Sequence, residues 1–210
     1  MSSIRLPRIF VLSPARCDGR RAQALLNPGA EFPLAVQLRQ RDGAALGEVF
    51  AFLSGLYFRG KLTYARAFAS SDVVAAPIRI ITTNSGMLTP EDRVGISDVE
   101  DFARVDLSTA GDEFQMPLLQ DATQLAADAP PNALVVLLGS IATNKYVGPL
   151  MRVFGERLVF PRDFVGRGDM SRGGLMLRHA QSGTELAYDA IATAIRHGAR
   201  PPKLAPLRSR

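Results

Sequence analysis

The sequence predicts an α/β fold with a mainly parallel sheet of four to five strands, helices on both faces and a helical N-terminal layer. The first observation is that short apolar, β-branched runs alternate with helical patterns along the chain. The second is that these runs are almost continuously apolar, which is typical of strands covered on both faces. The third is a helical stretch over residues 20–70, which is too long for a single crossover and therefore predicts an additional helical layer.

Four runs predict buried strands because they are short, apolar and rich in β-branched residues. They are residues 8–12, 78–82, 133–138 and 157–160. A fifth run, residues 185–191, alternates between apolar and polar positions and fits either an edge strand or the start of a helix.

Helical periodicity lies between and after these runs. Ser97 with Glu100 three residues later has the spacing of a capping box, so we expect a short helix to begin at residue 98. The other expected helices come from apolar residues at helical spacing. They cover residues 33–41, 46–56, 61–69, 114–127, 146–154 and 171–181.

Composition predicts one folded domain over residues 1–195, followed by a basic, Pro-rich tail over residues 196–210 that we expect to be extended or disordered. Of the 210 residues, 47% are hydrophobic and 21% charged, which predicts a normal buried core. No apolar run approaches the roughly 18–20 residues of a membrane span, and the N-terminal apolar run is short for a signal peptide. We therefore expect a cytoplasmic location and no membrane partner.

A single cysteine and two histidines exclude an internal disulfide and a Cys-rich zinc site, so we expect no metal and no cofactor. The net charge of +5 favours a polyanionic partner, either nucleic acid or a phosphorylated ligand. Part of that charge lies in the C-terminal tail, so the excess also has a simple compositional explanation.

Small polar residues follow the carboxyl end of each predicted strand. In a parallel sheet these ends share one edge, which is where open α/β folds bind ligands. Helices begin after such loops, and their free N–H groups favour anions. We therefore predict a ligand site built from all four loops, with these residues: Ser13, Arg16, Asn84, Ser85, Gly139, Ser140, Asn144, Tyr146, Arg167, Gly168 and Arg172.

Three residues in these loops are candidate catalytic groups. Asp18 and Asp163 are the carboxylates that we consider for general-base work. Cys17 follows a strand, and the cations of Arg16 and Arg20 beside it are expected to lower its pKa and favour a nucleophilic thiolate. The alternative is a small, semi-buried thiol without a catalytic role.

The segment DFVGRGDMSRGG, residues 163–174, combines four glycines with Arg167 and Arg172. Glycines let a backbone approach a ligand closely, and arginines donate bidentate hydrogen bonds to phosphate or carboxylate. We interpret the segment as an anion-holding loop. The alternative is a plain turn in which Asp169 caps the following helix.

No catalytic motif is present, since the chain has no GxxxxGK[ST] loop, no HExxH and no GxSxG. Tyr57, Phe58 and Tyr64 lie close to Arg59 and Lys61, a pattern suited to stacking a base beside phosphate-binding cations. The alternative for these aromatic residues is the core.

Several fragments carry a resemblance to a known family. They are LSPARCDGRRA (residues 12–22), LYFRGKLTYARAFA (56–69) and IRIITTNSGMLTPED (78–92), followed by Gly139 with the later Tyr146 and by the glycine-rich segment before the last helix. Together they resemble the YaaA-type superfamily and its small relatives of unknown function. The resemblance implies an α/β domain related to nucleic-acid-associated proteins. Its members are linked to DNA binding, to protection of DNA under oxidative stress, or to handling of modified guanine-type bases.

The leading hypothesis is therefore a nucleic-acid-associated protein that binds a nucleobase or nucleotide at the sheet edge and hydrolyses or modifies it. In this hypothesis the three loop arginines contact phosphate, and the asparagine, serine and tyrosine side chains orient the base. The first alternative is an enzyme acting on a small phosphorylated or carboxylated metabolite in the same pocket. The second is a non-enzymatic accessory protein.

Overall fold

The computed structural model describes residues 6–71, 74–107, 111–142, 144–202 and 204. Its main sheet has six strands in the order β4-β3-β1-β6-β7-β8. Its central strands are parallel and are β1 (Arg8–Leu12), β3 (Ile78–Ile81), β6 (Leu134–Leu138) and β7 (Leu158–Pro161). The prediction of a mixed α/β fold with a mainly parallel sheet is therefore confirmed.

The predicted number of strands, four to five, was wrong, because the main sheet has six. Antiparallel strands close the sheet on both sides, with β4 (Met87–Leu88) on β3 and β8 (Tyr188–Ala190) on β7. β4 has only two residues, too few to show a period, and it follows a tight turn in which Gly86 has a φ of 62°. The alternating run at residues 185–191 is resolved as an edge strand.

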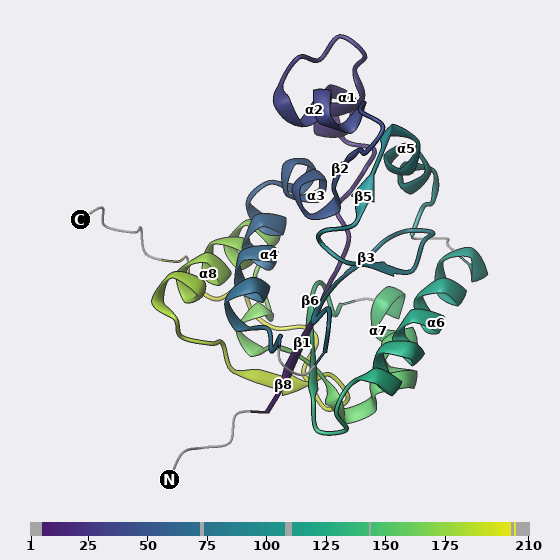
Figure 1. Cartoon of the computed structure of the whole chain (residues 1–210). Coiled ribbons are helices and arrows are strands. Elements are labelled where there is room, and N and C mark those ends of the chain that lie inside the picture. The colour runs from purple at the N-terminus through teal and green to yellow at the C-terminus, as the bar shows by residue number, and fades with distance from the viewer. Residues whose placement is uncertain (1–5, 72–73, 108–110, 143, 203, 205–210) are drawn as a thin grey trace.

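Helices cover both faces of this sheet (Figure 1), as predicted. On one face lie α4 (Leu56–Phe68) and α8 (Asp169–Ser182). On the other face lie α6 (Asp112–Asp128) and α7 (Asn144–Phe154). Short 3-10 turns flank β7, at Gly155–Arg157 and Arg162–Phe164. Within the described chain, no helix is both long and apolar enough to cross a membrane.

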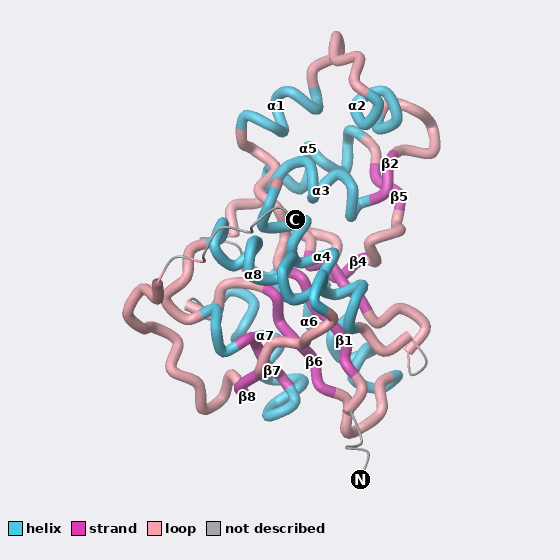
Figure 2. Tube along the Cα trace, turned by 90° about the vertical axis from the view of Figure 1, so that its left-hand side faces the viewer, coloured by secondary structure: helices cyan, strands magenta, loops and turns pink. Residues whose placement is uncertain are grey.

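A second layer lies beyond one end of the main sheet (Figure 2). It holds the helices α1 (Arg20–Leu26), α2 (Pro33–Leu38), α3 (Leu46–Ser54) and α5 (Ile96–Arg104). Within it, β2 (Ala44–Ala45) pairs antiparallel with β5 (Arg93–Val94), a pairing that the sequence did not predict. The expected helical N-terminal layer therefore exists, and a later segment, residues 93–104, completes it.

Two helix starts differ from the sequence-based expectation. The N-cap of α5 is Gly95, whose backbone N–H donates to the Asp98 carboxylate at 2.7 Å, so Ser97 lies inside the helix. The N-cap of α8 is Gly168, which places Asp169 at the first helical position. A carboxylate in the first turn still stabilises a helix, because it faces the positive end of the helix dipole.

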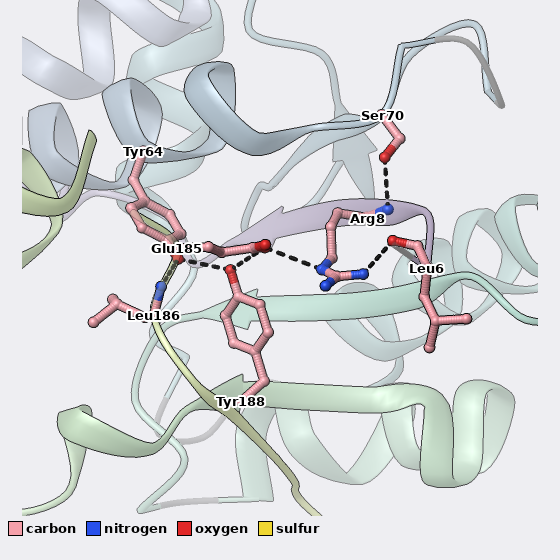
Figure 3. A network of polar contacts seen from close by, with 7 residues as sticks. All are labelled: Leu6, Arg8, Tyr64, Ser70, Glu185, Leu186 and Tyr188. Carbon is pink, nitrogen blue, oxygen red and sulfur yellow. Dashed lines mark hydrogen bonds and ion pairs between the residues drawn. The ribbon is translucent and has the colours of Figure 1, made fainter. Parts of the chain in front are cut away.

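A polar network ties the C-terminal segment to the centre of the sheet (Figure 3). The Tyr64 hydroxyl on α4 accepts a hydrogen bond from the Leu186 N–H at 2.8 Å and contacts the Tyr188 hydroxyl at 2.7 Å. Tyr188 in turn donates to Glu185, which pairs with Arg8 on β1 at 3.0 Å. The network joins segments more than 100 positions apart in the sequence, so it stabilises the docking of β8.

The described part of the predicted tail lacks regular secondary structure and contacts the domain. The Arg196 guanidinium donates to the Asn144 side chain at 2.8 Å, and the Pro202 carbonyl accepts from Arg167 at 3.3 Å. A Cβ atom on Gly166 would lie 2.1 Å from the Ala199 carbonyl oxygen, so the chain also packs against the glycine-rich segment.

Candidate functional site

A cavity of about 550 Å³ lies at the carboxyl edge of the central strands. Its walls come from residues 14–18 after β1, from residues 102–107 at and beyond the end of α5, and from Thr83, Lys145 and Tyr146. The cavity therefore lies between the edge of the main sheet and the second layer. Its position matches the predicted ligand edge, and its volume is within the range of small-molecule sites.

Charged side chains gather at this cavity. Arg16, Arg104 and Lys145 supply the cations, and Asp18 and Asp106 supply the carboxylates. Arg16 and Asp18 form an exposed, bidentate ion pair, with Nη2 and Oδ2 2.9 Å apart. The hydrogen bond from Arg16 lowers the pKa of Asp18, which is opposite to the shift that a general base at neutral pH requires. The geometry therefore favours Asp18 as an orienting partner of Arg16.

Cys17 lines the cavity but is buried, and its thiol donates to the Ala15 carbonyl at 3.6 Å. Burial raises its pKa to about 12, with a further contribution from Asp18. We expected the neighbouring arginines to lower this pKa, and that expectation was wrong. The Arg16 guanidinium pairs with the exposed Asp18 carboxylate and so does not stabilise a thiolate at Cys17. The Cys17 sulfur is buried, and burial disfavours its charged form.

Two aromatic residues are among those that line the cavity. Phe102 comes from α5 and Tyr146 from the first turn of α7. Tyr146 packs edge-on against Phe114, and burial raises the pKa of its hydroxyl to about 12. The cavity thus combines aromatic surface with cations, which is the combination that holds a base and a phosphate.

The loop after β3 contributes to the cavity through Thr83, whose hydroxyl donates to the Phe102 carbonyl at 2.9 Å. Asn84 and Ser85 lie one turn further, where the Ser85 hydroxyl donates to the Asn84 side chain at 2.9 Å. Neither of these two residues lines the cavity. They serve the tight turn into β4.

In the loop after β6, too, only some of the predicted residues line the cavity. Tyr146 lines the cavity, whereas Ser140 accepts a backbone N–H from Ala142 and Asn144 pairs with Arg196. Gly139 lies directly against the loop after β1, because a Cβ atom there would be 2.8 Å from Cβ and 3.0 Å from Oγ of Ser13. A glycine is therefore required beside this hydroxyl.

The glycine-rich segment does not reach this cavity. Arg167 and Gly168 line a separate cleft of about 350 Å³ together with Arg178, Arg200 and tail residues. Asp163 lies in a 3-10 turn. The structure therefore does not bring the fourth loop together with the other three.

Arg172 lies in the interior of this segment rather than in its cleft. Its guanidinium donates to the Phe164 carbonyl at 3.0 Å and lies over the Phe164 ring. Gly173 faces α4, where its Cβ would lie 2.7 Å from the Leu56 carbonyl oxygen. These two residues hold the loop and helix α8 in place.

The sequence analysis named Lys61 of α4 only as a phosphate-binding cation beside Tyr57, Phe58 and Tyr64. The structure instead buries all four residues, so the alternative, a place in the core, holds for the aromatic residues. This lysine is only 1% exposed, and its ammonium group reaches the carbonyl oxygen of Ser13 at 2.6 Å and the Ser13 hydroxyl at 3.0 Å. A signal existed in the helix itself. Lys61 lies four residues after Tyr57 and four before Ala65, so the helical period places it on the apolar face.

The predicted absence of a metal remains a prediction; in the part of the chain that the structure describes, no three histidine, cysteine or carboxylate side chains come together to hold an ion. No protein-family model, no curated protein and no solved structure matches this chain. The functional argument therefore depends on the geometry of the site.

Proposed function

We propose that this protein binds a nucleotide, either free or as a unit of a nucleic acid, in the cavity at the carboxyl edge of the sheet. The observation that carries the proposal is that Arg16, Arg104 and Lys145 line one cavity together with the aromatic residues Phe102 and Tyr146. Cations suit the phosphate, and aromatic faces suit the base. The net charge of +5 supports an anionic ligand.

The site residues have different roles in this proposal. We assign Arg104 and Lys145 to phosphate. Arg16 is paired with Asp18 at the cavity, whereas the exposed ion-pair partner of Arg104, Asp101, does not line the cavity. Thr83 and Asp106 lie on the same wall and can accept or donate hydrogen bonds to base or sugar. We had expected Arg167 and Arg172 to contact the phosphate as well, but neither residue lines this cavity, and they have no role in the proposal.

The test is fluorescence anisotropy with a labelled mononucleotide and with labelled single- and double-stranded DNA and RNA, over a salt series. The double variant R104A/K145A should weaken binding at least tenfold. The matched control is R167A/R200A, which removes the same charge from the separate cleft and should leave the affinity within about twofold. Absence of binding by the wild type at moderate salt would overturn the proposal.

A second candidate function is an enzyme for a small phosphorylated or carboxylated metabolite. It is favoured by Asp18 and Asp106, because two carboxylates at the cavity oppose the approach of an extended polyanion. The same titrations, extended to such metabolites, separate the two. Binding of a phosphorylated or carboxylated metabolite without binding of the mononucleotide or any polynucleotide supports the second function, whereas a steep salt dependence with polynucleotides supports nucleic acid.

A further inference from the structure

Lys61 is a buried cation without a buried anion. Among the described residues, its Nζ forms hydrogen bonds with Ser13 alone, at the backbone carbonyl oxygen (2.6 Å) and at Oγ (3.0 Å). No carboxylate in the described part of the chain forms an ion pair with it. A buried charge is normally paired, so an unpaired lysine in the interior calls for a chemical explanation.

Two aromatic rings complete its surroundings. The Tyr57 and Phe58 ring centroids lie 4.6 Å and 4.7 Å from Nζ. The Tyr57 hydroxyl is itself buried. Arg172 lies close enough to its oxygen to lower the pKa of Tyr57, but the O–H group donates to no acceptor among the described residues. The cluster therefore holds one polar group, an O–H donor, that the described residues leave without an acceptor.

Burial lowers the pKa of Lys61 to about 7, so a large fraction of the side chain is a neutral amine near neutral pH. A neutral amine has two N–H donors and one lone pair. One N–H then donates to the Ser13 carbonyl, and the lone pair is free to accept the proton of the Ser13 hydroxyl. The distances of 2.6 Å and 3.0 Å from Nζ allow both hydrogen bonds at once.

We propose that Ser13 is a nucleophile, that Lys61 is its general base, and that the pair hydrolyses a carboxylic ester. The geometry is that of an activated nucleophile, with nucleophile and base in hydrogen-bond reach and the base oriented by a third group. Here the third group is the Ser13 carbonyl, together with the two rings. The Tyr57 hydroxyl is the donor that we assign to the carbonyl oxygen of the ester.

The position of Ser13 suits this role. It lies at the carboxyl end of β1, directly before Pro14, which lines the cavity, and it remains 6% exposed. On its other side Gly139 leaves room for the hydroxyl, since a Cβ atom there would lie 3.0 Å from Oγ. Ser13 itself does not line the cavity, so in this proposal the substrate reaches it from the cavity past Pro14.

The reaction needs no group beyond these and water. Lys61 takes the Ser13 proton as Oγ bonds to the acyl carbon, and the bond from carbon to the leaving oxygen then breaks as that oxygen receives the proton from Lys61. The acyl group is now on Oγ. Lys61 next takes a proton from water as the water oxygen bonds to the acyl carbon, and Oγ leaves and recovers that proton. The products are a carboxylic acid and an alcohol, and the enzyme is restored.

The first experiment is labelling of the full chain with a fluorophosphonate, in which Oγ displaces fluoride from phosphorus. Intact mass should show one adduct, and peptide mapping should place it on Ser13. The S13A variant should show none, and K61M should label at least 100-fold more slowly. The matched control S140A, at the end of the neighbouring strand, should label like the wild type.

A second measurement covers the case in which K61M does not fold. The labelling rate of the wild type should rise with pH through about 7, as Lys61 loses its proton. The groups that face this cluster are Tyr57 on α4, Asp169 and Arg172 on α8, and Tyr146 on α7. The two tyrosines have their pKa raised to about 12, so they do not titrate in this range.

The proposal is overturned if folded wild-type protein gives no adduct on Ser13, or if the labelling rate does not change between pH 6 and 8. It goes beyond nucleotide binding and is tested separately from it. R104A/K145A should keep fluorophosphonate labelling even where it loses the nucleotide. Conversely, S13A should keep nucleotide binding even where it loses labelling.

Discussion

Gly60 of α4 and Gly173 of α8 meet backbone to backbone. A Cβ atom on Gly60 would lie 2.6 Å from the Gly173 carbonyl oxygen, and a Cβ atom on Gly173 would lie 2.9 Å from the Tyr57 Cα. The two helices therefore cross with no side chain between them. This close crossing fixes α4, which carries Tyr57 and Lys61, against the loop and helix that hold Arg172.

We expect Gly60→Ala to lower the free energy of unfolding by about 1–3 kcal/mol, because the added methyl group meets rigid backbone and forces the helices apart. Urea denaturation measures this change. The control is Gly174→Ala on the partner helix α8, where the added Cβ meets only the Leu204 side chain at 3.6 Å. That variant should be neutral or more stable by up to about 1 kcal/mol, since alanine favours a helix over glycine. Equal losses in both variants would argue against the close crossing.

Lys61→Met should change how stability depends on pH. Burial lowers the pKa of Lys61 to about 7 in the folded state, whereas the unfolded chain keeps the ordinary value of 10.5. Between these two values the unfolded state binds more protons, so the free energy of unfolding of the wild type rises with pH across this window. The full change in the free energy of unfolding is about 1.4 kcal/mol for each unit that separates the folded and unfolded pKa values of Lys61.

Methionine does not titrate, so the K61M variant lacks this contribution. The free energy of unfolding of the wild type minus that of the variant should therefore increase from pH 7 to pH 10. Denaturant titrations at several pH values measure it. Taking the difference cancels the contribution of tyrosines, whose raised pKa values act in both proteins. A difference that stays flat over this range would show that Lys61 is not desolvated as the structure indicates.

The ion pair of Arg8 with Glu185 should couple more strongly than a surface pair. Both side chains are 13% exposed, and the carboxylate also accepts a hydrogen bond from Tyr188. A double-mutant cycle with R8M and E185Q should give a coupling energy of about 1.5–3 kcal/mol, as expected for a hydrogen bond between charged groups away from solvent. The matched cycle is Arg66 with Glu91, whose side chains are 55% and 71% exposed. It should give less than about 1 kcal/mol.

Cys17 should be an unreactive thiol in the folded protein. Its pKa of about 12, raised by burial, reduces the thiolate at neutral pH roughly 1000-fold below that of an ordinary cysteine. Reaction with a disulfide reagent at pH 7.5 should therefore be at least 100-fold slower than in urea, where the chain is unfolded. Fast reaction of the native protein would restore the thiolate hypothesis.

The four central strands could be predicted because each is a short, continuously apolar run. The polar residues at their ends could be predicted for the same reason, since parallel strands bring their carboxyl ends to one edge. The predicted ligand edge indeed has a cavity lined by Arg16, Asp18 and Tyr146. The two-residue strands β2, β4 and β5 could not be predicted, because two residues contain no period.

The sequence by itself thus determined the class of fold, the positions of the four central strands along the chain and the edge of the sheet at which the cavity lies. The tertiary structure decided which side chains meet there. In the folded chain, Arg172 donates to the Phe164 carbonyl and does not line the cavity. Thr83 lines the cavity, whereas the predicted Asn84 and Ser85 do not. Lys61 contacts Ser13, 48 positions away in the sequence. The physical reason is that periodicity reports only which face of an element is apolar. The partner across the interface, and the burial that shifts the pKa of Lys61 or Cys17, depend on how elements distant in sequence pack.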